Sequence, residues 1–380
     1  MASSLTEPQD ASHAARIGLA ALLVGLGLGR FAYTPLLPAM VAGGWFSAAE
    51  ATSAGAANLI AYLIGAVLAS PAARLIPLPS LMRIAVAMTT ATFAGCATRP
   101  SLWAFLLLRR LAGIAGGAII VLGPPALLAK APATRRGRTS GWMSAGVGLG
   151  IAAASGLLPV LLRFGVASAW WGLAVGGAMA TAVAWHGWPP AQLPPPAERS
   201  LARGDLLRLV SAYTISAVAL VPHMLLISDC VARPLGGGVV TGALAFVAYG
   251  IGAALGPVLG GRLGDRFGFQ RVLSLAIVAQ VAAVTAPALI PTVPGAIVSA
   301  LIVGALTPGL PPLVLNRAVE LAGAEEAART WGTATIGYAV GQAIGAWATA
   351  TAFAALGDHR PLFVGAGLIA VAAFALLPRR

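Results

Sequence analysis

Residues 248–271, AYGIGAALGPVLGGRLGDRFGFQR, join an apolar, glycine-rich helix end to a short charged turn. A similar helix lies much earlier in the chain, because AYLIGAVL at 61–68 shares six of eight residues with AYGIGAAL at 248–255. The two segments are 187 positions apart in a chain of 380 residues. A segment that recurs after about half the length indicates an internally duplicated protein.

Two further matches extend the duplication. GPPALLAK at 123–130 aligns with LPPLVLNR at 310–317, again 187 positions apart. RTSGWMSAGVGLG at 138–150 aligns with RTWGTATIGYAVG at 329–341, at an offset of 191. The change of four positions falls in a loop, where insertions are tolerated. Three matches in one order predict two six-helix halves in parallel orientation.

The composition indicates a membrane protein. The chain is 58% hydrophobic and 9% charged, with a mean hydropathy of +0.88, whereas soluble domains carry roughly 25% charged residues. Apolar runs of about 20 residues recur along it, the length with which a helix crosses a hydrocarbon core of roughly 30 Å. We therefore expect an all-α membrane protein with twelve transmembrane helices in two pseudo-symmetric bundles. The expected spans are 17–41, 48–71, 82–98, 101–130, 139–162, 167–187, 206–230, 239–261, 271–291, 294–316, 330–356 and 361–378.

A proline-rich segment separates the two halves. Residues 188–205, WPPAQLPPPAERSLARGD, are first rich in proline and then charged, which is typical of an interdomain linker. The sequence thus predicts an N-terminal six-helix bundle at 1–187, a cytoplasmic linker at 188–205 and a C-terminal six-helix bundle at 206–380.

The basic residues indicate the orientation in the membrane. The net charge of +13 is scattered singly through short loops, so no nucleic-acid partner is expected despite the high charge. With the N-terminus inside, 17 Lys and Arg residues fall in inner segments and four in outer segments. The positive-inside rule then predicts a multi-pass protein of the bacterial inner membrane with both termini in the cytoplasm.

Together these features resemble the major facilitator superfamily (MFS). GGRLGDRFGFQR at 260–271 is similar to its cytoplasmic signature loop, G-x-L-x-D-R-x-G-x-x-R, and follows the eighth expected span. GLGLGRFAYTPLLPAM at 25–40 resembles the first span of the YbfB/YjiJ-type branch. The resemblance implies the MFS fold and a small-solute transporter. The first-half counterpart of the loop, PAARLIPLPSLMR at 71–83, lacks the Gly-Asp-Arg centre, and the fifth span lacks the Gly-Pro pair of drug/proton antiporters.

The resemblance also implies a gate at the signature loop. In the resembled fold this turn contacts the start of the fifth span, so Asp265 would face a positive helix N-terminus and the side chain of Arg138. We hypothesise that this contact latches the outward-open state, on one side only, because the first half lacks the aspartate. The residues of this gate are Gly261, Gly264, Asp265, Arg266, Gly268, Arg271 and Arg138.

Arg30 lies near the middle of the first expected span. An arginine at that depth costs roughly 2.5–3.5 kcal/mol on translocon scales, so it needs a cavity or a partner. Tyr33 and Thr34 follow at i+3 and i+4 and share its helix face. Arg30 either lines a central cavity and meets an anionic group, or it holds neighbouring helices together through their carbonyls.

Arg109 and Arg110 lie in the fourth expected span. Adjacent helical positions point about 100° apart, so only one of the two can face a cavity squarely. Arg109 forms an R-x-x-x-G pattern with Gly113 that resembles the fourth-span motif of the superfamily, which implies a role in coupling or gating. Arg110 is expected to snorkel or to bond a neighbouring helix.

Uncharged polar side chains recur at helical spacing in two other spans. Asn58 and Tyr62 share a face of the second span, and Tyr338 and Gln342 share a face of the eleventh. They are candidates to line a substrate cavity, and the alternative is that they hydrogen-bond between helices at about 0.6 kcal/mol each.

Groups that could couple transport to protons are few. Asp229 is the one acidic residue expected inside a span, near the outer end of the seventh, and His223 lies deeper in the same span. A histidine can change its charge near neutral pH. The alternatives are a structural hydrogen bond for His223 and an interfacial position for Asp229.

These observations predict a secondary active transporter. No motif of an enzyme is present, and we expect no catalytic residue, no cofactor and no metal. Three intramembrane arginines against at most one acid favour a small organic anion or carboxylate as the substrate, with protons as a candidate coupling ion. The alternatives are a multidrug or metabolite efflux pump and a membrane sensor that binds without transport. We expect a monomer whose other partner is the lipid bilayer.

Overall fold

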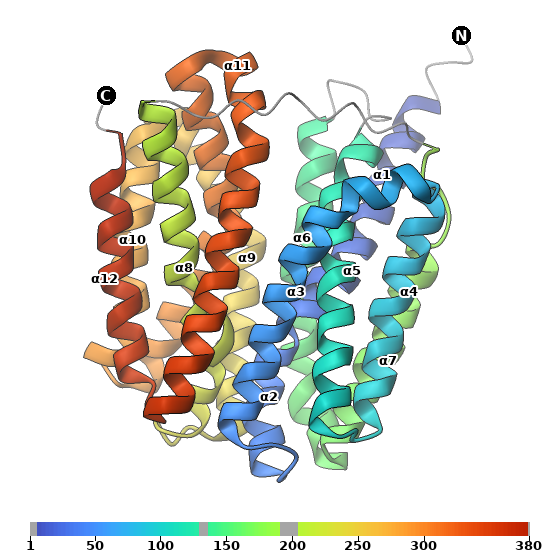
Figure 1. The fold of residues 1–380 in the computed structure, drawn as a ribbon, viewed down its shortest axis with the longest axis vertical. Helices are drawn as coiled ribbons and strands as arrows, with labels where there is room; N and C mark the ends of the chain where they lie inside the picture. Colours follow the sequence, from blue (N-terminus) through green and yellow to red (C-terminus); the bar gives the residue numbers. More distant parts are fainter. Residues whose placement is uncertain (1–5, 129–135, 191–203, 379–380) are drawn as a thin grey trace.

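The computed structural model describes residues 6–128, 136–190 and 204–378, with side chains described outside 6–11, 136–138 and 324–329. All secondary structure in these residues is helical (Figure 1). Eleven helical segments there are long and apolar enough to cross a membrane, and α12 is a shorter apolar helix of 17 residues. The prediction of an all-α membrane protein is confirmed.

The helices follow one another in two sets of six spans. The first set contains α1 (Thr6–Leu22), the π-helix η1 (Leu23–Phe31), α2 (Tyr33–Ala42), α3 (Ala48–Leu75), α4 (Leu78–Ala97), α5 (Leu102–Leu128), α6 (Arg136–Leu161), the 3₁₀-helix η3 (Leu162–Phe164) and α7 (Val166–Ala184). The second set contains α8 (Asp205–Ala232), α9 (Gly238–Phe267), α10 (Phe269–Leu289), α11 (Val293–Leu356) and α12 (Arg360–Leu376).

Two regions of the described chain are not simple single helices. The first, expected at 17–41, is built from α1, η1 and α2, with nine π-helical residues in its middle. The element α11 holds two spans, Val293–Gly323 and Thr330–Leu356, and Gly323 breaks it with φ +81°. Most of the expected linker, 191–203, lies outside the described residues.

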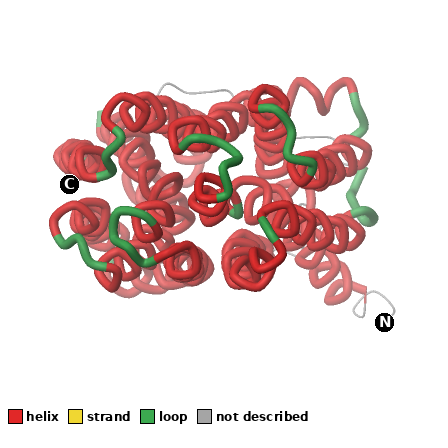
Figure 2. The backbone as a smooth tube through the Cα atoms, turned by 90° about the horizontal axis from the view of Figure 1, so that it is seen from below, coloured by secondary structure: helices red, strands yellow, loops and turns green. Residues whose placement is uncertain are grey.

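Figure 1 shows the two bundles side by side with both chain ends at one end of the molecule, here called the terminal end. The opposite end is here called the far end. The bundles diverge toward the terminal end and approach one another at the far end, where α2 lies (Figure 1). Contacts between the halves join α6 to α9, α3 to α11, and α2 to both α8 and α9. Figure 2 shows the same two groups of helices seen along their length.

The same close helix contacts occur in both halves. A Cβ atom at Gly117 would overlap the carbonyl oxygen of Tyr62, and a Cβ atom at Gly304 would overlap that of Tyr249. Both residues of the second pair lie 187 positions after those of the first. Small residues at these crossings let helix backbones approach closely. The internal repeat therefore preserves the backbone packing.

The first spans of the two halves correspond at the other offset. Gly150 packs against Leu23, and Gly341 packs against Thr214. These pairs are 191 positions apart, which is the offset of the third sequence match.

Large apolar side chains cover the outside of the bundles. Trp103 is 76% exposed and Leu368 is 69% exposed, and many other large hydrophobic residues face outward. Exposed apolar surface on this scale marks contact with a membrane, so lipid surrounds the bundles.

Candidate functional site

Arg30 joins the two halves in the middle of the molecule. It lies at the end of the π-helix η1, and its side chain is buried, with 9% of its surface exposed. Its Nη2 donates a hydrogen bond of 2.8 Å to Oε1 of Gln342 on α11. Its guanidinium carbon lies 4.7 Å from the ring centroid of Tyr62 on α3. A π-helical segment at such a position is a frequent feature of functional sites.

Tyrosines of the C-terminal half surround the same guanidinium. Tyr249 and Tyr338 lie close enough to Arg30 to interact with its charge. The Tyr338 hydroxyl donates to the carbonyl of Thr307 at 3.1 Å, and its ring stacks on Tyr213 with centroids 4.4 Å apart. Sequence reasoning identified Tyr338 but missed Tyr249 and Tyr213. The repeat could have identified Tyr249, which is the counterpart of Tyr62 at the offset of 187.

Arg109 forms a second buried group inside the N-terminal half. It is 1% exposed, and its Nη1 donates to the carbonyl of Gly29 at 3.0 Å. Its guanidinium carbon lies 4.6 Å from the ring centroid of Tyr33. The amide of Asn58 donates to the Arg109 carbonyl at 2.8 Å. Arg109 therefore bonds the backbone of the residue directly before Arg30. Its neighbour Arg110, by contrast, is exposed.

Neither Arg30 nor Arg109 has a carboxylate partner among the described residues. The ion pairs there are Arg208–Asp205, Arg233–Asp229, Arg317–Glu320 and His359–Asp229. Nε of Arg30, and Nε and Nη2 of Arg109, are buried without a hydrogen-bond partner. A buried charge is costly unless it is paired, and the hydrogen bonds of these two guanidiniums go to an amide oxygen and a backbone carbonyl.

Thr34 and Gln342 extend the contact between the halves. The Thr34 hydroxyl of α2 donates to the carbonyl of Met224 on α8. The amide nitrogen of Gln342 lies 3.9 Å from the sulfur of Met224. Through Met224, these contacts join both α2 and α11 to α8.

His223 lies apart from the Arg30 group. Its Nε2 is 2.6 Å from the hydroxyl of Ser299, which itself donates to the carbonyl of Ala283. Its ring packs edge-on against Phe363, with centroids 4.9 Å apart. All these partners belong to the C-terminal half, and among the described residues none of them is a predicted cavity residue.

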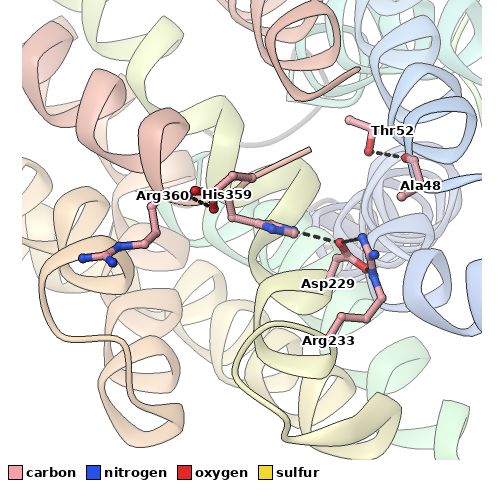
Figure 3. Close-up of polar contacts among 7 residues, drawn as sticks. Ala48, Thr52, Asp229, Arg233, His359 and Arg360 are labelled. Carbon is pink, nitrogen blue, oxygen red and sulfur yellow. Dashed lines mark hydrogen bonds and ion pairs between the residues drawn. The ribbon is translucent and has the colours of Figure 1, made fainter. Parts of the chain in front are cut away.

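Asp229 is the centre of a charged group near the far end. Its carboxylate is fully buried and accepts from Nε of Arg233 at 2.6 Å and from Nη2 of the same residue. Nε2 of His359 lies 2.8 Å from the same carboxylate (Figure 3). The hydrogen bond to Asp229 raises the pKa of Arg233. The sequence did not identify His359, because it is 130 positions away at the start of α12.

The signature loop consists of the terminal end of α9 and the turn into α10. Gly268 has φ +85° and lies between α9 and α10, where a residue with a Cβ would be strained. Gly264 is buried against the ring of Phe269. Asp265 is exposed, and no interaction of its carboxylate falls within the described side chains, which do not include Arg138. The remaining loop residues, Gly261, Arg266 and Arg271, lie at the surface or half-buried.

Two helical bundles that meet at a buried polar group define a membrane transporter of the MFS type. The chain belongs to the family whose model is described as "Uncharacterised MFS-type transporter YbfB", which matches residues 22–377. It is similar in structure to a POT family transporter crystallised in complex with 5-aminolevulinic acid, with a TM-score of 0.73, 13% identity and coverage of 95% of each chain. That identity carries the fold alone. No curated protein matches the chain.

Proposed function

We propose that this transporter moves a small organic anion, such as a carboxylate, across the bacterial inner membrane, and that Arg30 binds its charge. The single observation that carries the proposal is the burial of Arg30 between the halves without a carboxylate partner among the described residues. Gln342 offers a neutral partner that an anion can displace. The proposed carrier acts as a monomer and is not an enzyme.

The proposed transport cycle uses the interface between the halves. The contacts of Arg30 with Gln342 and of Thr34 with Met224 cross this interface. Alternating access requires the two bundles to rock about such a site. The divergence of the bundles toward the terminal end (Figure 1) supports an inward-facing state if the termini lie in the cytoplasm. The excess of basic residues in the loops on that side supports this orientation.

The proposed coupling ion is the proton. Asp229, paired with His359 and Arg233, is the buried carboxylate of the described spans. Arg109 is the proposed link between coupling and Arg30, because it binds the Gly29 carbonyl next to it. His223 is a weaker candidate, because its Nε2 is already paired with Ser299.

The test is uptake into proteoliposomes from a panel of organic anions, matched cations and neutral analogues, with and without a pH gradient. We expect saturable uptake of at least one small anion and stimulation by a gradient. A matched control is Arg163→Gln, which removes an exposed positive charge away from the site, and it should leave uptake unchanged. Saturable uptake of cations with no anion transported would overturn the proposal.

A further inference from the structure

A groove on the outer surface lies between the two halves, apart from the Arg30 site. It has a volume of about 350 Å³, and its walls come from α3, α5 and the second span of α11. Figure 1 shows α3 between α11 and α5 on this face. Its walls are mostly alanine, isoleucine and leucine. Along α3 it runs from Ser53 to Ile64, which is about 16 Å of helix.

One charged side chain lines this apolar groove. Arg110 is exposed, and no hydrogen bond or ion pair of its guanidinium occurs within the described part of the chain. It lies eight residues after Leu102, the far end of α5, so its Cα is about 12 Å inside the helix. An arginine that faces lipid at that depth needs an anionic partner or water.

An indole faces the same groove from the other half. Trp347 of α11 lines the groove and is 62% exposed. It lies nine residues before Leu356, the far end of its span, and so at about the depth of Arg110. Tryptophan usually lies near the headgroups, where its N–H meets polar groups. The groove therefore combines a cation, an N–H donor and a long apolar wall.

We propose that this groove binds one anionic phospholipid, with the phosphate on Arg110 and an acyl chain along α3. The charge of Arg110 complements the phosphate, because a guanidinium matches phosphate oxygens in a two-pronged hydrogen bond. The length and apolar walls of the groove suit a chain and not a free ion. Because the walls belong to both halves, the lipid binds this relative arrangement of the bundles and stabilises it. This site is independent of the solute that Arg30 binds.

The test measures phosphatidylglycerol retained by the purified full-length transporter. After detergent washing, native mass spectrometry counts bound lipid, and a titration with phosphatidylglycerol or phosphatidylcholine gives the affinity of each. We expect about one phosphatidylglycerol on the unmodified protein. Arg110→Leu should weaken its affinity at least tenfold, and Arg110→Lys should weaken it less, since lysine binds phosphate as a point charge.

Two further variants separate the charge from the groove. Arg163→Leu removes a charge elsewhere on the surface and should retain the lipid. Ala354→Phe fills the exposed apolar wall and should lose the lipid while Arg110 remains. Equal affinity in Arg110→Leu and Arg163→Leu, or unchanged affinity in Ala354→Phe, would overturn the proposal.

The remaining outcomes identify other occupants. Displacement of phosphatidylglycerol by millimolar inorganic phosphate alone would show a site for a free anion and overturn the proposal. Dimers of the unmodified protein that Ala354→Phe dissociates would show that a second copy fills the groove, which would also overturn it. Gel filtration and helical circular dichroism confirm that each variant is folded. If Arg110→Leu does not fold, the loss of affinity in Arg110→Lys still tests the proposal.

Discussion

The two halves share their backbone packing but not their charges. Gly117 against Tyr62 and Gly304 against Tyr249 are the same helix contact, repeated 187 positions later. At this offset Ala296 is the counterpart of Arg109, and it is fully buried. At the offset of the first spans, Val221 is the counterpart of Arg30, and it is also buried. Both repeats share the scaffold, but Arg30 and Arg109 belong to the N-terminal half, and the buried Arg317 of the C-terminal half is paired with Glu320.

The C-terminal half contributes neutral groups to the shared site. Gln342 and the tyrosines around Arg30 are neutral. They interact with its guanidinium without cancelling its positive charge, as a carboxylate would. Asp229, the buried acid among the described residues of this half, is paired within its own bundle with Arg233 and His359. Under the proposed function, this division assigns the charge that binds the anion to the N-terminal half and the neutral contacts to the C-terminal half.

The largest effect should follow loss of the charge on the N-terminal side. Arg30→Gln should lower uptake of the transported anion roughly 1,000-fold, which corresponds to about 4 kcal/mol. The reason is that the substitution removes the cation from the buried pair that Arg30 and the bound anion form in the proposed function. Gln342→Ala should lower it only about tenfold, since the cation remains. Initial uptake rates measure both. Equal losses in the two variants would contradict the division between a charged and a neutral half.

Asp229→Asn should have the next largest effect, on stability. The isosteric change leaves the half-exposed Arg233 and the buried His359 without their carboxylate, and loss of this partly screened ion pair costs about 2–3 kcal/mol. Thermal unfolding in detergent measures the loss. Asp358→Asn is the control, because Asp358 is exposed and adjacent to the same helix start. A melting temperature shared by both variants would show that the Asp229 group adds no stability to its half.

The glycine contacts test the shared scaffold directly. Gly117→Ala and Gly304→Ala each place a Cβ against a backbone carbonyl of the neighbouring helix, and overpacking of this kind costs about 2 kcal/mol. The two variants should lower the melting temperature by similar amounts. Gly141→Ala is the control, because no atom lies near its Cβ position. A large effect in one half alone would show that the repeated packing is not equally tight.

The sequence predicted the helical architecture well, because hydropathy and the repeat are local or periodic signals. The cost of a charge inside a span selected Arg30, and helical spacing selected Asn58 and Gln342. Their partners were not predictable in the same way, because Arg30 and Gln342 are 312 positions apart and meet only when the halves pack. Arg30 lies in a π-helix, in which side chains do not follow the 3.6-residue period of an α-helix. A pattern with that period therefore does not predict which way its side chain faces.

The smallest expected effect concerns the signature loop, another feature of the C-terminal half alone. Asp265 is exposed and without a partner among the described side chains, as a latch that closes only in the opposite state requires. Asp265→Asn should shift the distribution between inward and outward states two- to threefold toward the inward state, because an exposed charge contributes little.

Spin-label distances across the terminal end measure this distribution, and thermal unfolding should be unchanged. Arg266→Gln, in the same loop but with its guanidinium beside the Phe267 ring, is the matched control. If Asp265→Asn leaves both the distribution and the transport rate as they are, the latch does not exist. The asymmetry between the halves then rests on the buried charges alone, because the signature loop would have no part in the motion.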